Sequence, residues 1–455
     1  QKSLQLLAMK GGSQEEEVNY EGVSSSGRTE EEWAADLKEL AEGAKGMSID
    51  PEGGDGDDLQ TPKRKKGFLK GIGKGVKGLL RGATFKKDED DPEELQKARL
   101  HKELALCRHP QAHKDGGLIN TDLEGIKMSR SVVAEIVKQV GKKILSGQNL
   151  MSVTFPVRCC QPRSILECAA YQFVYCPHYL TKAAASSDPV ERMKQAVCCF
   201  VACIHTTSQF VKPFNPTLGE TLQATFQGGT QLFMEQTSHH PPVTSWLLTG
   251  AGDSYRYYGW STYEASFGVN KLYVKQSGVR LCEFADGSVI DVGFSMDRYN
   301  NVYWGDLIQE MVGGYQFRDT KSGIQCTIEL NPYKELPSDV FVGSIDKIDA
   351  EGESLETLCQ VEGSWLGYLD FDNVRYWDFK SDTRTDPVMI SDPLPSDSRF
   401  RDDRNALAGG DVDKAQIQKT VIEDRQRRER RLRAAAQKAL ESGGGWDSQA
   451  AADVK

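Results

Sequence analysis

Between residues 220 and 380 the sequence consists of short runs in which apolar and polar side chains alternate. Examples are TLQATF, SYRYYGW and KLYVKQ, and Gly, Asn-Lys and Asp-Gly turns separate the runs. Alternation with a period of two predicts strands that bury one face, and turns at this spacing predict antiparallel pairing of consecutive strands. Many short strands of this kind are typical of a meandering barrel. This segment therefore restricts the chain to a β-rich fold.

Helical patterns lie on both sides of the strand-rich segment. The acidic stretch 88–95, DEDDPEEL, predicts a helix that runs towards Leu106, and apolar residues recur at helical spacing in 128–145. Residues 188–214 predict a helix followed by a loop, and the highly charged stretch 414–440 predicts a last helix. We therefore expect a β-rich α+β fold.

The first sixty residues are strongly acidic. Residues 1–60 contain 15 Asp or Glu against 5 Lys or Arg and are interrupted by SSSG and EGGDGDD. Such a composition buries too little apolar surface to offset the entropy of ordering, so we predict disorder. Residues 29–44 could form one short helix with Thr29 as its N-cap, which would either dock on a partner or have no role.

The charge reverses in residues 63–87, KRKKGFLKGIGKGVKGLLRGATFKK, which hold ten basic residues and no acidic ones. Apolar residues that include Phe68 and Leu69 recur at helical spacing, and a second face carries Lys70, Lys74, Lys77 and Arg81. This pattern predicts a basic amphipathic helix on an anionic membrane surface. Six glycines disfavour the helix in water, so we expect it to form on the membrane. A nucleic-acid or nuclear-import segment and a solvated linker are the alternatives.

Several function classes are disfavoured by what the sequence lacks. No run of 18 apolar residues occurs, so no helix is expected to span a membrane. The eleven cysteines form no CxxC pair and no zinc-ligand spacing, and the doublets Cys159-Cys160 and Cys198-Cys199 stand in apolar segments. We expect reduced, buried thiols in a cytosolic protein and no metal site. Without GxSxG, HExxH or Walker A motifs we expect neither catalysis nor a cofactor.

Two adjacent histidines precede two prolines in residues 235–242, EQTSHHPP. Proline fixes its own φ and biases the preceding residue towards extended geometry, so the direction of the His240 ring is expected to be fixed by the chain. A rigid clamp for an anion or another ligand needs this property. A strand end followed by a turn with both histidines in water is the alternative.

Two further stretches combine with the first. Residues 212–221 read KPFNPTLGET, and residues 397–427 contain RFRDDRNALAGGD followed by a helix in which Lys419, Glu423 and Arg427 stand four residues apart. A charged helix alone is usually a solvated one. Together, the three blocks resemble the oxysterol-binding-protein family, whose patterns are EQ-x-SHHPP, KPFNP-x-LGET and R-x-DR-x-AL-x-x-GD with K-x3-E-x3-R. Every fixed position of the first two patterns matches.

The resemblance implies a large antiparallel, incomplete β-barrel around a hydrophobic lipid tunnel, with N-terminal lid helices and C-terminal helices. The implied domain order is an acidic segment 1–60, a basic segment 61–90, a helical linker 91–116, a lipid-binding domain 117–446 and a tail 447–455. Residues 117–150 would be the lid, because MSVTFPV from 151 resembles the segment that follows the family's lid.

The resemblance also implies a headgroup site for a phosphoinositide. Its residues would be Lys212, Asn215, His239, His240, Lys419, Glu423 and Arg427. A phosphate monoester carries a charge near minus two, so convergent lysine, arginine and imidazole donors suit it. Residue chemistry alone implies only a phosphorylated headgroup, whereas the family implies phosphatidylinositol 4-phosphate.

The expected function is therefore lipid transfer: exchange of a phosphoinositide for a sterol or phosphatidylserine between membranes. The expected partners are these lipids and an anionic membrane surface, without nucleic acid, in a cytoplasmic protein that associates peripherally with membranes or membrane contact sites. A static phosphoinositide-binding scaffold is the alternative. A lipid hydrolase with His239 or His240 as base is disfavoured because no nucleophile accompanies them.

Overall fold

The computed structural model describes residues 91–140, 155–208, 210–268, 270–381 and 383–441 of the 455, with the backbone alone for 133–140. The predictions for 1–60 and 61–90, for the lid beyond 140 and for the tail lie outside the described residues. They include the prediction that Phe68, Leu69, Lys70, Lys74, Lys77 and Arg81 bind a membrane. From Leu100 onwards the described chain forms one compact unit.

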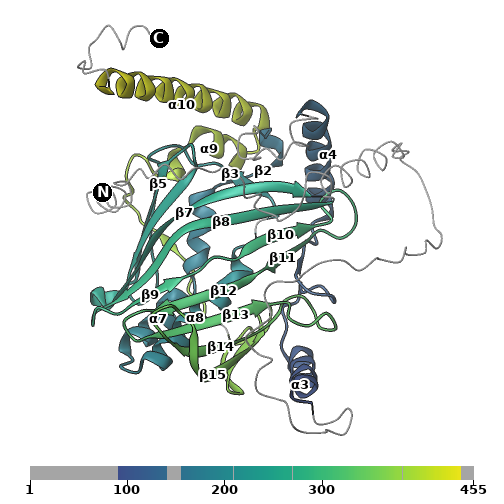
Figure 1. Cartoon of the computed structure of the whole chain (residues 1–455). Coiled ribbons are helices and arrows are strands. Elements are labelled where there is room, and N and C mark those ends of the chain that lie inside the picture. Colours follow the sequence, from purple (N-terminus) through teal and green to yellow (C-terminus); the bar gives the residue numbers. More distant parts are fainter. Residues whose placement is uncertain (1–90, 141–154, 209, 269, 382, 442–455) are drawn as a thin grey trace, which may run out of the picture. The chain divides into compact units, whose positions relative to one another are not determined.

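One sheet of 16 strands dominates this unit (Figure 1). Its strands are β1 (Leu118–Ile119), β4 (Thr221–Thr225), β5 (Gln231–Ser238), β6 (Val243–Thr249), β7 (Tyr255–Gly268), β8 (Lys271–Phe284), β9 (Val289–Val292), β10 (Met296–Asn300), β11 (Ile308–Val312), β12 (Gly314–Asp319), β13 (Ile324–Leu330), β14 (Val340–Ile348), β15 (Ser354–Ser364), β16 (Tyr368–Phe371), β17 (Val374–Asp378) and β18 (Val388–Met389). The main path runs β17-β16-β15-β14-β13-β12-β9-β8-β7-β6-β5-β4-β18. All of its pairings are antiparallel, and β17 and β18 do not pair with each other. The predicted β-rich α+β fold with an incomplete barrel is confirmed.

Local sequence explains the meander. Along β5 the residues at 232, 234 and 236 are buried and alternate with more exposed ones, as a strand with one covered face requires. The hairpin between β16 and β17 turns on Asp372 and Asn373, whose φ values are 47° and 65°. Positive φ at both central residues is the geometry of a type I′ turn, whose twist matches that of the strands.

The sheet forks at the long strand β8. Its first residues, Lys271 to Lys275, pair with β10, whereas Leu281 to Glu283 pair with β9. Strand β10 continues the second branch to β11, which pairs in turn with β1. At this fork, residues of β7, β8 and β10 form one wall of a cavity.

The helices are α3 (Pro92–Leu106), α4 (Leu123–Val140), α6 (Ile165–Ala169), α7 (Cys176–Ala185), α8 (Pro189–Cys203), α9 (Asp402–Ala408) and α10 (Val412–Glu441), with 3-10 turns η2 (Val157–Cys159), η3 (Ala170–Phe173), η4 (Ile204–Thr206), η5 (Ala251–Asp253) and η6 (Ser398–Phe400). No helix in the described ranges has the length and apolar character needed to cross a membrane.

The main core lies between α7, α8 and the sheet. Helix α8 begins after Asp188, whose carboxylate accepts a bond from the amide of Val190, and Pro189 occupies the first turn. From Gln195 to Cys203 every residue of α8 is buried, because the helix packs against β13, β16 and β17. Each fully buried large apolar side chain contributes about 1.5 to 3 kcal/mol. All eleven cysteines are free of disulfides, and ten are buried, which confirms the prediction that the thiols are buried.

One predicted helix and one predicted loop differ from the structure. Helix α4 begins at Leu123 rather than at residue 128, because the Asp122 carboxylate accepts a bond of 3.0 Å from the amide of Gly125 and caps the earlier turn. The loop expected up to residue 214 ends in a short strand, β3 (Lys212–Phe214), which pairs in parallel with β2 (Cys160–Ser164). The C-terminal helices α9 and α10 pack against strands β2 and β3.

Helix α10 packs against this part of the chain through its N-terminal end. Ala415 is fully buried in a cluster with Val157 and Phe214, and the amide of Val157 donates to the side chain of Gln416 at 2.9 Å. Helix α9 packs against both β2 and α10, and the two C-terminal helices lie together beside β2 and β3 (Figure 1). The charged face of α10 is thereby directed at β3 and at the end of β5.

Candidate functional site

Two cavities meet at Lys212. The first has a volume of about 400 Å³ and lies against the inner face of the forked sheet. The second, which we call the charged pocket, has a volume of about 650 Å³ and lies between β3, the β5–β6 turn and α10. Phe155, Lys212 and Asn215 line both. An elongated ligand with an apolar and an ionic end could therefore occupy both cavities.

The first cavity is mainly apolar, and we call it the apolar cavity. Its wall includes Ile126, Val132, Phe200, Ile204, Phe210, Phe267, Leu272, Val274 and Met311. Ile126 and Val132 belong to α4, so this helix forms part of the wall. Burial of apolar surface contributes about 25 cal/mol per Å², so the lining favours a hydrocarbon ligand.

One carboxyl group faces this cavity. Asp297 of β10 lines it and accepts a bond of 2.6 Å from the amide nitrogen of Gln309. Burial raises the pKa of Asp297 to about 6, although the bond from Gln309 opposes the shift. The cavity therefore holds a carboxyl group whose pKa lies about one unit below neutral pH.

Lys212 lies at the junction of the two cavities without a carboxylate partner in the described part of the chain. Its ammonium group donates to Oδ1 of Asn215 at 2.8 Å and to the carbonyl of Pro213 at 3.1 Å. The ring of Phe155 lies 5.6 Å from it. Burial lowers the pKa of Lys212, and the positive charges of Lys419 and Arg401 act in the same direction. An anion would relieve this unfavourable environment.

His239 and His240 occupy the turn between β5 and β6. Their ring centroids are 4.6 Å apart and the rings meet edge to face. Burial lowers the pKa of both rings, and the positive charge of Arg430 lowers it further. The rings are therefore neutral at neutral pH until an anion approaches.

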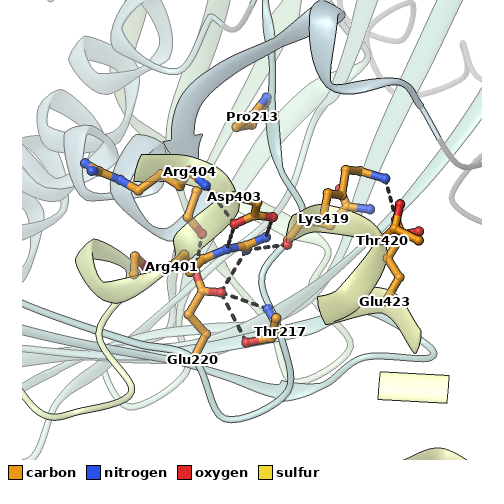
Figure 2. A network of polar contacts seen from close by, with 12 residues as sticks. Pro213, Thr217, Glu220, Arg401, Asp403, Arg404, Lys419, Thr420 and Glu423 are labelled. Carbon is orange, nitrogen blue, oxygen red and sulfur yellow. Dashed lines mark hydrogen bonds and ion pairs between the residues drawn. The ribbon is translucent and has the colours of Figure 1, made fainter. Parts of the chain in front are cut away.

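Lys419, Glu423 and Arg427 share one face of α10, as their four-residue spacing predicted. The Glu423 carboxylate accepts a bond from the Lys419 ammonium group and lies 3.4 Å from Nη2 of Arg427. Nη1 of Arg427 also contacts Asp424 at 2.6 Å. Figure 2 shows Lys419 and Glu423 on the helix next to the buried network described below. Glu423 therefore holds two cations in position towards the charged pocket.

A network of buried ion pairs and hydrogen bonds lies at the wall of the charged pocket (Figure 2). Arg401 donates to both oxygens of Asp403, at 3.0 and 2.7 Å, and its Nη1 donates to Glu220 at 2.9 Å and to the carbonyl of Asn215 at 2.7 Å. The side chains of Arg401 and Glu220 are only 9% and 1% exposed. Although burial alone would lower it, Glu220 and Asp403 hold the pKa of Arg401 above its ordinary value.

Hydroxyl groups complete this network around Glu220. Ser164 and Ser398 donate to one carboxylate oxygen, Ser398 at 2.8 Å, and the amide of Thr217 donates to the other at 2.9 Å. The network joins β2, the loop after β3, η6 and α9. It therefore fixes the loop that carries Asn215 relative to the C-terminal helices.

All seven headgroup residues predicted from the sequence line the charged pocket: Lys212, Asn215, His239, His240, Lys419, Glu423 and Arg427. Their role in binding a headgroup stays a prediction. Arg401, Gln426 and Arg430 line the same pocket but were not predicted from the sequence. The R-x-DR pattern could have indicated Arg401, and helical spacing from Lys419 could have indicated the other two.

Three buried thiols also lie close together, although their spacing in the sequence does not suggest a metal site. The sulfur atoms of Cys176, Cys199 and Cys203 lie within 4.8 Å of one another. Burial favours the neutral form of all three thiols and raises the pKa of Cys176 and of Cys199 well above the ordinary value, whereas hydrogen bonds with these two lower the pKa of Cys203. All three side chains belong to the buried apolar core. We therefore interpret the three as packing groups of the core.

An open antiparallel barrel with an apolar cavity that continues into a charged pocket defines a lipid-binding domain. The chain belongs to the oxysterol-binding protein family, whose model matches residues 136–393 and 384–443. Proteins of this family bind and transfer lipids and are not enzymes.

Relatives and solved structures agree with this assignment. Oxysterol-binding protein 9 of Dictyostelium discoideum is 33% identical over 349 residues, which cover 72% of this chain and 81% of the relative. Oxysterol-binding protein-related protein 3B of Arabidopsis thaliana is 27% identical over 322 residues, or 65% and 68% of the two chains.

The crystal structure of the Osh3 ORD in complex with PI(4)P from Saccharomyces cerevisiae has a TM-score of 0.53 at 20% identity and covers 75% of this chain and 90% of its own. The Osh1 ORD domain in complex with ergosterol has a TM-score of 0.56 at 19% identity, with coverage of 78% and 90%. At these identities the structures establish the fold.

Proposed function

We propose that this protein carries a phosphoinositide, phosphatidylinositol 4-phosphate, with its headgroup in the charged pocket and its acyl chains in the apolar cavity. The observation that carries the proposal is the junction at Lys212, which lines both cavities. A phospholipid has an ionic headgroup joined directly to hydrocarbon chains, so a site for it needs such a junction. The Osh3 ORD is similar in fold and binds PI(4)P.

The headgroup phosphate would be held by Lys212, His239, His240, Lys419 and Arg427. Charge-assisted hydrogen bonds contribute about 1.5 to 3 kcal/mol each. Glu423 would keep the two α10 cations apart and directed into the pocket, and Asn215 would orient the Lys212 ammonium group, which it contacts at 2.8 Å. Binding would also compensate for the burial of Lys212.

The second lipid would be a sterol or phosphatidylserine that occupies the same apolar cavity, so that the two lipids exclude each other. The Osh1 ORD, similar in fold, binds ergosterol and cholesterol. Mutual exclusion would let one protein exchange the two lipids between membranes. Helix α4 would act as part of a lid, because it forms a wall of the cavity and Nη2 of Arg130 is held by the Asn301 carbonyl at 2.9 Å.

We propose that the protein works in the cytoplasm, peripherally associated with membranes or membrane contact sites. The basic segment at 61–90 would provide adsorption to an anionic surface, with Phe68 and Leu69 inserted and Lys70, Lys74, Lys77 and Arg81 near the headgroups. This division would separate membrane attachment from lipid binding.

A transfer assay between two liposome populations tests the proposal. Donor liposomes contain labelled phosphatidylinositol 4-phosphate, acceptor liposomes contain labelled sterol or phosphatidylserine, and movement of both labels is followed. We expect each lipid to accelerate transfer of the other. Tight binding of the phosphoinositide without transfer would instead identify a static scaffold, and lack of extraction of any of these lipids would refute the proposal.

A further inference from the structure

The charged pocket extends beyond the residues assigned above. Gln426, Arg430 and Arg433 of α10 also line it. They stand at intervals of four and three residues, so they continue the face that carries Lys419 and Glu423. With a rise of about 1.5 Å per residue, the helix advances about 21 Å from residue 419 to residue 433. A single phosphate cannot contact both ends of this stretch.

Gln426 presents an unused hydrogen-bond donor to the pocket. Its amide nitrogen is buried and has no acceptor among the described residues. A buried donor without a partner destabilises a protein, so such groups are rare unless a ligand or water completes them. An acceptor-rich group in the pocket would satisfy this nitrogen.

Arg430 and Arg433 differ from the neighbouring arginines of α10. Arg425 pairs with Glu429 at 2.9 Å, and Arg427 contacts Asp424 and Glu423. Within the part of the chain that the structure describes, neither Arg430 nor Arg433 has a carboxylate at ion-pair distance. Glu429, which also lines the pocket, pairs with Arg425. Two guanidinium groups therefore stay available to an anion.

The two groups of cations act on different ends of the pocket. Besides burial, Lys419 and Arg401 are the cations that lower the pKa of Lys212, whereas Arg430 is the cation that lowers the pKa of His240. The pKa of His239 is lowered by burial and by His240, and also by Arg401 and Arg430. Lys419 and Arg430 stand eleven residues apart on α10, about 16 Å along the helix, so the pocket has a Lys212 end and an Arg430 end.

We infer that Gln426, Arg430 and Arg433 form a second phosphate subsite, so that the charged pocket accepts an inositol headgroup with a phosphate additional to the one held at the Lys212 end. Arginine suits this role, because its planar guanidinium binds phosphate oxygens in pairs. The inference rests on the proposed function, since it extends the same headgroup site. The ligand could be a bisphosphorylated phosphoinositide or a soluble inositol polyphosphate, because both present the same group.

The test compares binding by the full chain and by Gln426→Ala/Arg430→Ala. The probes are liposomes with phosphatidylinositol 4-phosphate, liposomes with phosphatidylinositol 4,5-bisphosphate or 3,4-bisphosphate, and soluble inositol 1,4,5-trisphosphate. We expect the double variant to lose at least about tenfold in affinity for one of the bisphosphates while extraction of the monophosphate changes by less than about threefold. Arg433→Ala should have a smaller effect in the same direction.

Arg431→Ala is the matched control, because it removes the same charge from α10 at an exposed position outside the pocket lining. Equal losses for Arg431→Ala and for the double variant would mean a general charge effect and overturn the inference. So would equal losses for monophosphate and bisphosphate, or a wild type that binds only the monophosphate. Binding of the soluble trisphosphate alone, lost in the double variant, would support the subsite and assign it to a soluble ligand. Failure of the wild type to extract any phosphoinositide or to bind the trisphosphate would refute the proposed function as well.

Discussion

Nη1 of Arg401 donates to Oε2 of Glu220 at 2.9 Å, and this contact joins the loop before α9, at the wall of the charged pocket, to the residue that precedes β4. Both groups are almost completely buried and both are fully engaged. Loss of one partner leaves an uncompensated charge, which costs more than the pair itself contributes.

We therefore predict that Arg401→Ala lowers the free energy of unfolding by about 3 to 5 kcal/mol. Arg401→Lys should also destabilise, because an ammonium group cannot reproduce the paired bonds to Asp403. Urea unfolding measures both. Arg425→Ala, which breaks an exposed pair with Glu429, is the control and should cost less than about 1 kcal/mol. A similarly small loss for Arg401→Ala would show that the buried network contributes little to the free energy of unfolding.

The histidine pair gives a second prediction. Replacement of both His239 and His240 by Ala removes two donors, so extraction of phosphatidylinositol 4-phosphate should weaken by several kcal/mol, about 1.5 to 3 for each donor. Lys419→Ala and Arg427→Ala should impair the same step non-additively, because the groups share one ligand. Uptake of the second lipid should survive, since apolar contacts hold it. Normal phosphoinositide extraction by the double-histidine variant would contradict the assigned site.

The same histidines predict proton uptake on binding. Burial lowers the pKa of both rings in the free protein, and the charge of a bound phosphate raises it. Because the bound-state pKa is the higher one, affinity should rise as the pH falls from the bound-state to the free-state pKa and then level off. Calorimetry at pH 7.5 in buffers with different ionisation enthalpies measures the uptake. Uptake that persists in the double-histidine variant would assign the protons to other groups.

Asp297 gives a stability prediction with a defined pH window. Its pKa is raised by burial from 3.8 to about 6, so ionisation of this group destabilises the folded protein. Asp297→Asn should therefore stabilise the protein above pH 6 by up to about 2 to 3 kcal/mol, since one pKa unit corresponds to about 1.4 kcal/mol. The gain should disappear below pH 3.8, where the carboxyl is neutral in both states. Asp291→Asn at an exposed position is the control. An equal gain at low pH would exclude ionisation as the cause.

The basic segment can be tested by deletion of residues 63–87. Each basic residue near an anionic bilayer contributes about 1 kcal/mol, and salt screens this attraction. We expect the deletion to reduce sedimentation with anionic liposomes at low salt and to have little effect at high salt. Unchanged sedimentation at low salt would show that membrane binding resides elsewhere in the chain.

Much of the fold followed from local patterns. Alternation in TLQATF and KLYVKQ predicted strands because side chains on a strand change face at every residue, and the apolar stretch around Val197 predicted α8. The start of α4 was misplaced because a single cap, Asp122, decided it, and caps lie outside the periodic pattern. Periodicity indicates which face of an element is covered but not which element covers it.

The sequence by itself determined that the chain is β-rich, that His239 and His240 precede two prolines, and that Lys419, Glu423 and Arg427 share one face. These properties depend on residue order within one element or turn. Only the tertiary structure decided that this face lies opposite Lys212, that Arg401 pairs with Glu220, and that Gln426 and Arg430 line the charged pocket. Such contacts join residues far apart in the chain, and they depend on the pairing of β2 with β3 and on the packing of α10 against these strands. Long-range packing sets both, and no local pattern encodes it.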